Sequence, residues 1–181
     1  NGAGKTTLFN LVTGVYRPSS GRILFGDMPL QGLSPASVCR AGIGRTFQSG
    51  RPFGNLTALE NVALPLYMQG ASRAAADAKA TVALERVGLG KRLDNLPSQL
   101  SGGEQQRVSI SRAIAHTPDV LFADEPTANL DKESSATVMG IFKELHKGGQ
   151  TIIMVTHEEE FSRFAERIVR LDDGKIVSGP R

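Results

Sequence analysis

The stretch that most constrains this chain stands at its first residues, Asn1-Gly-Ala-Gly-Lys-Thr-Thr7. Gly4-Lys5-Thr6 matches the closing half of the pattern G-x-x-x-x-G-K-[ST]. In that pattern successive backbone N–H groups wrap a polyphosphate, and the lysine reaches its outer phosphates. The pattern therefore predicts a polyphosphate site, with the hydroxyl of Thr6 placed to ligate Mg²⁺.

A helix is expected directly after this loop, with an apolar face formed by Leu8, Phe9, Leu11 and Val12. Gly14 suits the C-terminal stop of that helix. The dipole and the unbonded N–H groups at the N-terminus of a helix favour anions. The first glycine of the loop pattern would precede Asn1, so we expect the chain to open in the middle of the motif.

Composition narrows the function classes. The chain has 181 residues, of which 40% are hydrophobic, and this is enough for one sizeable core. The 21 cationic and 18 anionic side chains are interspersed, which favours a mixed solvated surface over a nucleic-acid interface. A single cysteine, Cys39, excludes a disulfide framework. No apolar run approaches the ~20 residues of a membrane span, so we expect any membrane association to come through a partner.

The first part of the chain contains predicted strands over residues 21–25 and 43–47, the second of which ends at Gln48. Ser34 and Pro35 have the N-cap and N1 chemistry of a short helix through Arg40. Two helices follow, the first starting at a Thr57–Glu60 capping box. Pro65 is expected to kink or end it.

The second of these helices is expected over residues 72–87, with a packing face formed by Ala75, Ala78, Val82 and Val87. These helices predict a helical subdomain over residues 57–100. It separates the first part of the core, residues 1–56, from the second part, residues 101–181.

The segment Leu100-Ser-Gly-Gly-Glu-Gln-Gln-Arg107 is a second motif. Ser101 and Glu104 have the spacing of a capping box, so a helix is expected to start here. Gly102 and Gly103 are poor helix formers in its first turn, each costing about 1 kcal/mol relative to alanine. Bare N–H groups at a positive helix end suit a close approach to phosphate, so we interpret the glycines as a second phosphate contact.

A third motif is the apolar strand that ends at Asp124 and Glu125. Because strand side chains alternate, the two carboxylates are expected to serve different parts of one site. The loop 128–131 then leads into a helix with Val138, Ile141, Phe142 and Leu145 on one face. A buried type of strand over residues 150–156 ends at His157. These strand ends collect polar side chains that a plain core would not need.

Together these residues closely resemble the nucleotide-binding subunit of ABC transporters. Gly2 to Thr7 matches the end of the Walker A motif, Gln48 the Q-loop, and Leu100 to Gln105 the signature. Leu121 to Glu125 matches Walker B, Ala128 to Asp131 the D-loop, and His157 the switch histidine. Glu104 stands where many members have glutamine. The resemblance implies an α/β P-loop NTPase core, a parallel sheet flanked by helices with an inserted helical subdomain. It also implies that the strand before the loop and the aromatic residue that stacks on adenine lie upstream of Asn1.

The resemblance further implies ATP hydrolysis with Mg²⁺. The ATP-binding residues would be Asn1, Gly2, Ala3, Gly4, Lys5, Thr6 and Thr7, and the metal residues would be Thr6, Gln48 and Asp124. Glu125 would be the general base, with His157 and Gln48 as further catalytic residues. Ser101, Gly102, Gly103 and Asp131 would serve the ATP of a second, head-to-tail copy.

The implied partners are transmembrane permease subunits and that second ATP-binding subunit, with no nucleic acid, on the inner face of the cell membrane. Ala58 to Pro65, Gln99 to Glu104 and Ala128 to Asp131 look like the lipoprotein-releasing and macrolide-export group. Ala41 to Thr57 instead resembles branched-chain amino-acid importer ATPases. Soluble ATPases of DNA repair or translation share these motifs, but the former insert a long coiled coil and the latter carry two cassettes. We expect a transporter subunit, with export slightly favoured.

Overall fold

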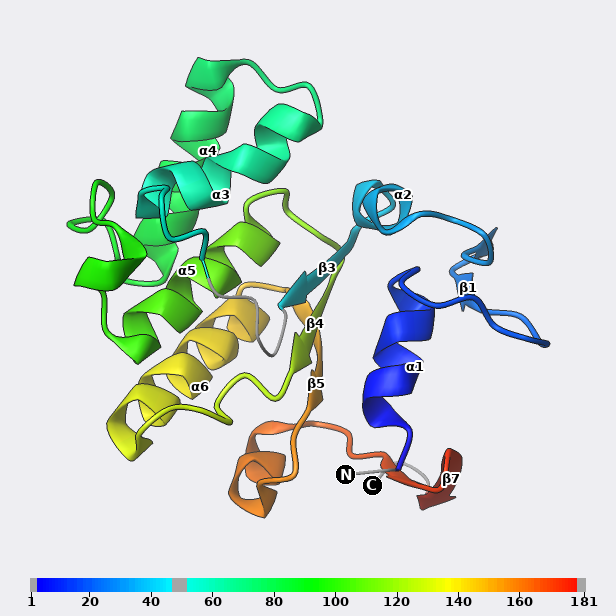
Figure 1. The fold of residues 1–181 in the computed structure, drawn as a ribbon. Coiled ribbons are helices and arrows are strands. Elements are labelled where there is room, and N and C mark those ends of the chain that lie inside the picture. Colours follow the sequence, from blue (N-terminus) through cyan, green and yellow to red (C-terminus); the bar gives the residue numbers. More distant parts are fainter. Residues whose placement is uncertain (1–2, 47–51, 179–181) are drawn as a thin grey trace.

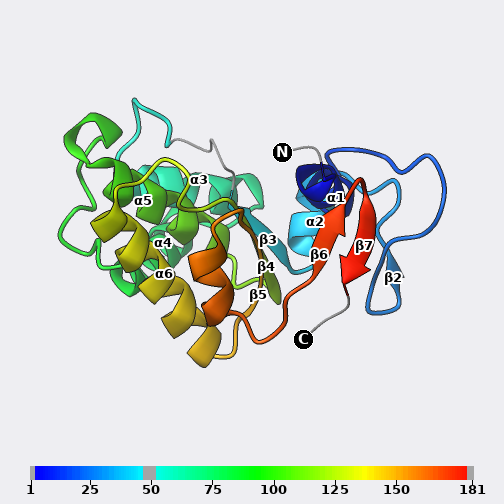
Figure 2. The same cartoon turned by 90° about the horizontal axis from the view of Figure 1, so that it is seen from below.

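The protein is described by a computed structural model that covers residues 3–46 and 52–178 (Figure 1). Its centre is a parallel sheet in the order β3-β4-β5, formed by Ile43–Thr46, Val120–Asp124 and Thr151–Val155. Parallel strands require long crossovers, and helices supply them here. Helices α5 (Gly102–Ile114) and α6 (Lys132–Lys147) lie on one side of the sheet and α1 (Lys5–Val12) on the other, as Figures 1 and 2 show. The predicted α/β fold with a parallel sheet is confirmed.

Helix α1 packs on the sheet through one aromatic residue. Phe9 is buried and its ring meets Phe122 of β4 edge to face, with 4.9 Å between the ring centroids. The predicted apolar face was wrong at Leu8, which is exposed, because it points away from the sheet-facing side that Phe9 defines. Gly14 has a φ of 75°, and a Cβ there would lie 2.8 Å from the carbonyl oxygen of Leu33. This position therefore requires glycine, and the predicted helix stop is confirmed.

Residues 15–42 lie beside α1 and the sheet. The predicted strand over residues 21–25 is confined to β1 (Leu24–Phe25), which pairs antiparallel with β2 (Met28–Pro29). The longer strand was wrong, because this small hairpin pairs with no other strand in the described part of the chain and its residues are largely exposed. Helix α2 (Pro35–Arg40) starts as predicted, since the Ser34 hydroxyl accepts a hydrogen bond from the Ser37 N–H at 3.2 Å.

Helices α3 (Ala58–Met68) and α4 (Arg73–Arg86) form the helical region, and the short turn η1 (Pro97–Gln99) follows. Both hydrogen bonds of the Thr57–Glu60 capping box are present, at 2.8 and 3.2 Å. Pro65 lies inside α3 and does not end it, so that alternative was wrong. The turn after it is held by bonds from the Gln69 N–H to two carbonyls and by the buried side chain of Leu66. The division into 1–56, 57–100 and 101–181 stays a prediction.

The packing face of α4 differs from the predicted one. Ala75, Ala78 and Val82 are exposed, and only Val87 of the predicted set is buried. The buried residues are Ala76, Ala80, Ala83 and Leu84. Alanine occurs on both the buried and the exposed side of this helix, so apolar periodicity does not select a face. The contacts with α3 and α5 select it, including a 3.2 Å hydrogen bond from the Ser111 hydroxyl to the Ala83 carbonyl.

Helix α6 buries Val138, Phe142 and Leu145 as predicted, with Ile141 partly buried. Strand β5 was expected to be buried along its length, but only Val155 is buried and Ile153 is exposed. The reason is that β5 lies at the end of the described sheet.

After β5 the chain forms a short 3₁₀ turn, η2 (Glu159–Phe164), and the hairpin β6 (Arg170–Asp172) and β7 (Lys175–Ser178). Within the described residues, no helix has the length and apolar character needed to cross a membrane.

Candidate functional site

The phosphate-loop residues stand at the N-terminus of α1. Gly4 is the N-cap residue with a φ of 82°, a left-handed conformation that suits glycine. The first turn contains Lys5, Thr6 and Thr7, and the N-cap residue Gly4 has no side chain that could cap its N–H groups. The Ala3 carbonyl accepts a hydrogen bond from the N–H of Gly174 in the β6–β7 turn at 3.1 Å. This helix end can accept an anion. Asn1 and Gly2 lie outside the described residues.

Two carboxylates follow one another at the end of β4. Asp124 is its last residue and is 1% exposed. Glu125 has a φ of 43°, which is uncommon for a residue with a side chain, and its N–H bonds to the Val155 carbonyl at 2.9 Å. Such strained positions cluster at functional sites. The two side chains have different partners, since Asp124 is paired with Arg45 and Glu125 lies next to His157.

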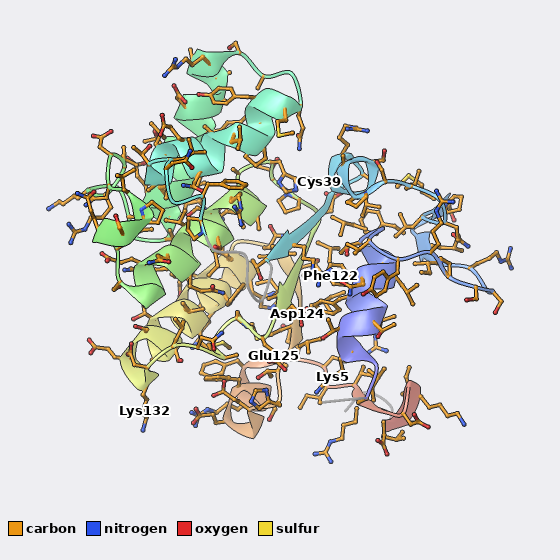
Figure 3. All side chains as sticks on the ribbon, viewed as in Figure 1. Lys5, Cys39, Phe122, Asp124, Glu125 and Lys132 are labelled. Atoms are coloured by element: carbon orange, nitrogen blue, oxygen red, sulfur yellow. The ribbon has the colours of Figure 1, made fainter. Side chains whose placement is uncertain are left out.

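His157 and Glu125 lie together although 32 positions separate them in the chain. The His157 Nδ1 atom is 3.2 Å from Glu125 Oε1. The two residues follow neighbouring parallel strands, β4 and β5, whose carboxyl ends meet at one edge of the sheet. Figure 3 shows Glu125 and Lys5 at this same end. Gln48, the remaining predicted catalytic residue, lies outside the described residues.

A second contact between the ends of β4 and β5 was missed by the sequence analysis. The buried Thr127 hydroxyl donates to Glu158 Oε1 at 2.9 Å. The Glu158 N–H in turn donates to the Thr156 hydroxyl at 3.0 Å. These bonds connect the segment that follows Glu125 with the residues on either side of His157. A glutamate next to the histidine was visible in the sequence, but its partner was not, because the contact is long-range.

The partner of Asp124 was missed as well. Its Oδ2 atom lies 3.0 Å from Arg45 Nη2, while Oδ1 is buried without a hydrogen-bond partner among the described residues. The arginine within strand β3 was the available signal, since a buried cation needs a partner.

The signature residues form the start of α5. The Ser101 hydroxyl accepts from the Glu104 N–H at 3.2 Å, and Glu104 Oε2 accepts from the Ser101 N–H at 2.8 Å, so the predicted capping box is confirmed. This backbone hydrogen bond lowers the pKa of Glu104. A Cβ on Gly103 would lie 2.6 Å from the Ser134 hydroxyl oxygen, whereas one on Gly102 would meet only Leu130 at 3.9 Å. Gly103 therefore has a packing reason that the sequence analysis did not recognise.

Asp131 caps the neighbouring helix α6. Its Oδ1 and Oδ2 atoms accept from the N–H and the hydroxyl of Ser134, both at 2.8 Å, which lowers the pKa of Asp131. Through Gly103 and Ser134 the starts of α5 and α6 lie together. Both are on the side of the sheet away from α1 (Figures 1 and 2). The predicted site residues therefore form two groups. One group consists of Ser101, Gly102, Gly103 and Asp131, and the other consists of Lys5, Asp124, Glu125 and His157.

The sequence matches known proteins along nearly its whole length. The family described as "ABC transporter" matches residues 1–128. An uncharacterised ABC transporter ATP-binding protein of Methanocaldococcus jannaschii is 44% identical over 180 residues, which are 98% of this chain and 80% of that protein. A macrolide export ATP-binding/permease protein of Aeromonas hydrophila is 45% identical over 179 residues, 97% of this chain but 28% of that protein. The chain thus spans less than a third of such a macrolide exporter.

Solved structures agree with these relatives. A dimeric ATP-binding cassette in a post-hydrolysis state with ADP and phosphate has a TM-score of 0.83 and 34% identity, covering 97% of this chain and 79% of that one. The ADP conformation of a cassette from an ABC transporter has a TM-score of 0.87 and 28% identity, covering 98% and 76%. The motifs, the fold and these relatives lead to one conclusion: the chain belongs to the ABC transporter family, as a nucleotide-binding domain.

Proposed function

We propose that this chain binds and hydrolyses ATP and so drives an ABC-type membrane transporter. The observation that carries the proposal is the contact between Glu125 and His157, at the same end of the sheet as the phosphate loop. A carboxylate and an imidazole from two strand ends can orient a water molecule and contact a phosphate. The resemblance and the named ATP-binding relatives support the same function.

Each residue of this group has a proposed role. Lys5 and the N–H groups of residues 2–7 hold the β- and γ-phosphates. Glu125 accepts the proton of the attacking water or orients it, and His157 contacts the γ-phosphate. Gln48 completes the set. The fixed turn at Glu125 keeps its carboxylate in place before the substrate arrives, so little reorganisation is needed during reaction.

The site also fits Mg²⁺, which is a proposal of its own. Asp124 Oδ1 is a buried carboxylate oxygen without a hydrogen-bond partner among the described residues, and oxygen is the ligand atom that Mg²⁺ prefers. Thr6 is exposed in the first turn of α1. Thr6, Gln48 and Asp124 would hold the ion, Asp124 mostly through water. When bound, Mg²⁺ neutralises charge on the phosphates.

The residues at the starts of α5 and α6 support a head-to-tail dimer. Ser101, Gly102, Gly103 and Asp131 belong to the starts of α5 and α6, two helices on the side of the sheet away from α1 (Figure 2). This position supports the proposal that they serve the nucleotide of a second copy. A related cassette is dimeric with ADP and phosphate bound.

The partners follow from the relatives. We propose that the chain works with transmembrane permease subunits on the inner face of the cell membrane, without nucleic acid. Several relatives are named as macrolide export proteins that combine ATP-binding and permease parts, which supports export over import.

Replacing Glu125 by glutamine tests the proposal. The variant should bind ATP like the parent and lose turnover by at least ~100-fold, or about 2.7 kcal/mol in activation free energy. Phosphate release and binding of a fluorescent ATP analogue measure the two quantities. Glu85→Gln, at an exposed position on α4, is the matched control and should hydrolyse ATP like the parent. Turnover of the Glu125 variant within a few-fold of the parent would remove Glu125 from the role of base.

A further inference from the structure

Arg45 is a charged side chain inside the sheet that the proposed chemistry does not use. Its side chain is 9% exposed, and its Nη2 atom lies 3.0 Å from Asp124 Oδ2. Its Nη1 atom donates to Asn10 Oδ1 at 2.7 Å and to Thr13 Oγ1 at 2.9 Å. Asn10 belongs to α1 and Thr13 is its C-cap residue. One side chain from β3 therefore holds both the helix of the phosphate loop and the carboxylate at the end of β4.

The geometry of this contact suits arginine in particular. Asn10 and Thr13 are three positions apart and so share one face of α1. The planar guanidinium presents several N–H donors in a fixed fork, so it can bond the helix and the carboxylate together, whereas the ammonium of a lysine is a point charge. The guanidinium carbon also lies 6.0 Å from the centre of the Phe9 ring, on the same helix.

The two carboxylate oxygens of Asp124 have different surroundings. Arg45 holds Oδ2, whereas Oδ1 is buried and has no hydrogen-bond partner among the described residues. Leaving such an oxygen unbonded is unfavourable unless a ligand or water meets it. Phe122 and Asp124 are two residues apart in β4 and so share one face of the sheet, the face on which Phe9 of α1 packs (Figure 3). The free oxygen is therefore on the side where α1 carries the phosphate loop.

We infer that Arg45 is a positioning residue for the metal–nucleotide site. It holds Asp124 by Oδ2 so that Oδ1 faces the metal, and it fixes the position of α1 relative to β4. The inference rests on the proposed function, because it assumes that a metal–nucleotide complex binds at this end of the sheet. It adds a residue from β3 that acts through its contacts with Asp124 and α1.

The charge of Arg45 and its role in positioning Asp124 predict opposite effects on metal binding when Arg45 is replaced. The guanidinium is a cation beside the metal ligand, so its charge alone opposes a second cation, and removing that charge would tighten metal binding. If Arg45 instead positions Asp124, removing it weakens metal binding because the carboxylate is no longer oriented. Arg45→Lys keeps the charge and loses the fork. This variant separates the two effects further, because it should bind the metal more weakly than the parent only if Arg45 positions Asp124.

The experiment measures Mn²⁺ binding by electron paramagnetic resonance, in the presence and absence of saturating ADP. Mn²⁺ prefers oxygen ligands as Mg²⁺ does. We expect the Kd of Mn²⁺ with ADP to rise at least ~10-fold in Arg45→Met and about 3-fold in Arg45→Lys. The matched control is Arg73→Met, because Arg73 is also ion-paired, to Asp77 at 3.8 Å, but its side chain is 86% exposed. The control should bind Mn²⁺ like the parent.

Asn10→Ala provides a second variant in case Arg45→Met fails to fold. It removes the 2.7 Å bond to α1 and leaves the buried ion pair in place. We expect its Kd for Mn²⁺ with ADP to rise about 3-fold, with a thermal melt close to that of the parent. Unchanged or tighter Mn²⁺ binding in Asn10→Ala, or in a folded Arg45→Met, would overturn the inference and leave the proposed function standing. A parent chain that binds neither ADP nor Mn²⁺ would overturn both.

Discussion

Replacing Asn61 by alanine should destabilise this protein more than most single substitutions. Asn61 is fully buried in α3, and its side chain bonds to backbone groups of the loop that precedes the helix. Oδ1 accepts from the Phe53 N–H at 2.6 Å. Nδ2 donates to the carbonyls of Phe53, Leu56 and Thr57 at 3.1, 2.9 and 3.0 Å. One side chain thus fixes the path of the chain into the helical region.

The magnitude follows from these contacts. Each hydrogen bond contributes about 1 kcal/mol net, and the four are not independent because the two hydrogens of Nδ2 serve three carbonyls. We therefore expect Asn61→Ala to lower the free energy of unfolding by about 3 kcal/mol. For a chain of this size that corresponds to a fall in Tm of roughly 9 °C. Asn61→Asp keeps the shape of the side chain but replaces the donor Nδ2 by an oxygen acceptor that faces three carbonyls. We therefore expect a similar fall in the free energy of unfolding.

Urea unfolding followed by circular dichroism measures the change, with Asn55→Ala as the matched control. Asn55 lies in the same loop but is exposed, so its replacement should change the free energy of unfolding by less than about 0.5 kcal/mol. If Asn61→Ala unfolds within 0.5 kcal/mol of the parent, the hydrogen bonds to the loop do not stabilise the fold as argued.

Two further predictions concern the start of α5 and the division of the site. Gly103→Ala should lower the free energy of unfolding by about 1 kcal/mol, because its Cβ would lie 2.6 Å from the Ser134 hydroxyl oxygen. Gly102→Ala is the control and should not lower it, since the nearest atom to its Cβ is 3.9 Å away. Equal thermal melts of the two variants would contradict the packing reason for Gly103. Ser101→Ala should impair hydrolysis but leave the affinity of the monomer for ATP nearly unchanged, whereas Lys5→Ala should abolish binding. Equal losses in nucleotide titrations of the two monomers would place Ser101 in the same subunit's site.

Local chemistry was predictable from the sequence. The N-caps at Ser34, Thr57 and Ser101 all form as expected, because a cap depends on residues within one turn of the chain. The apolar side of α6 was found in the same way, since a wide stripe of large residues gives a clear period. The resemblance implied that Glu125 and His157 serve one site, and the structure brings them together because the carboxyl ends of the neighbouring parallel strands β4 and β5 share one edge.

Features that depend on distant residues were decided by the tertiary structure alone. The packing face of α4 could not be predicted from alanines that occur on both its buried and its exposed side, and it is determined by contacts with α3 and α5. Arg45 and Asp124 are 79 positions apart, and their ion pair arises from the order of the strands. Gly103 appeared to be a purely functional glycine until α6 was placed against it. In each case the deciding free energy comes from burial between elements distant in the chain, which no local pattern records.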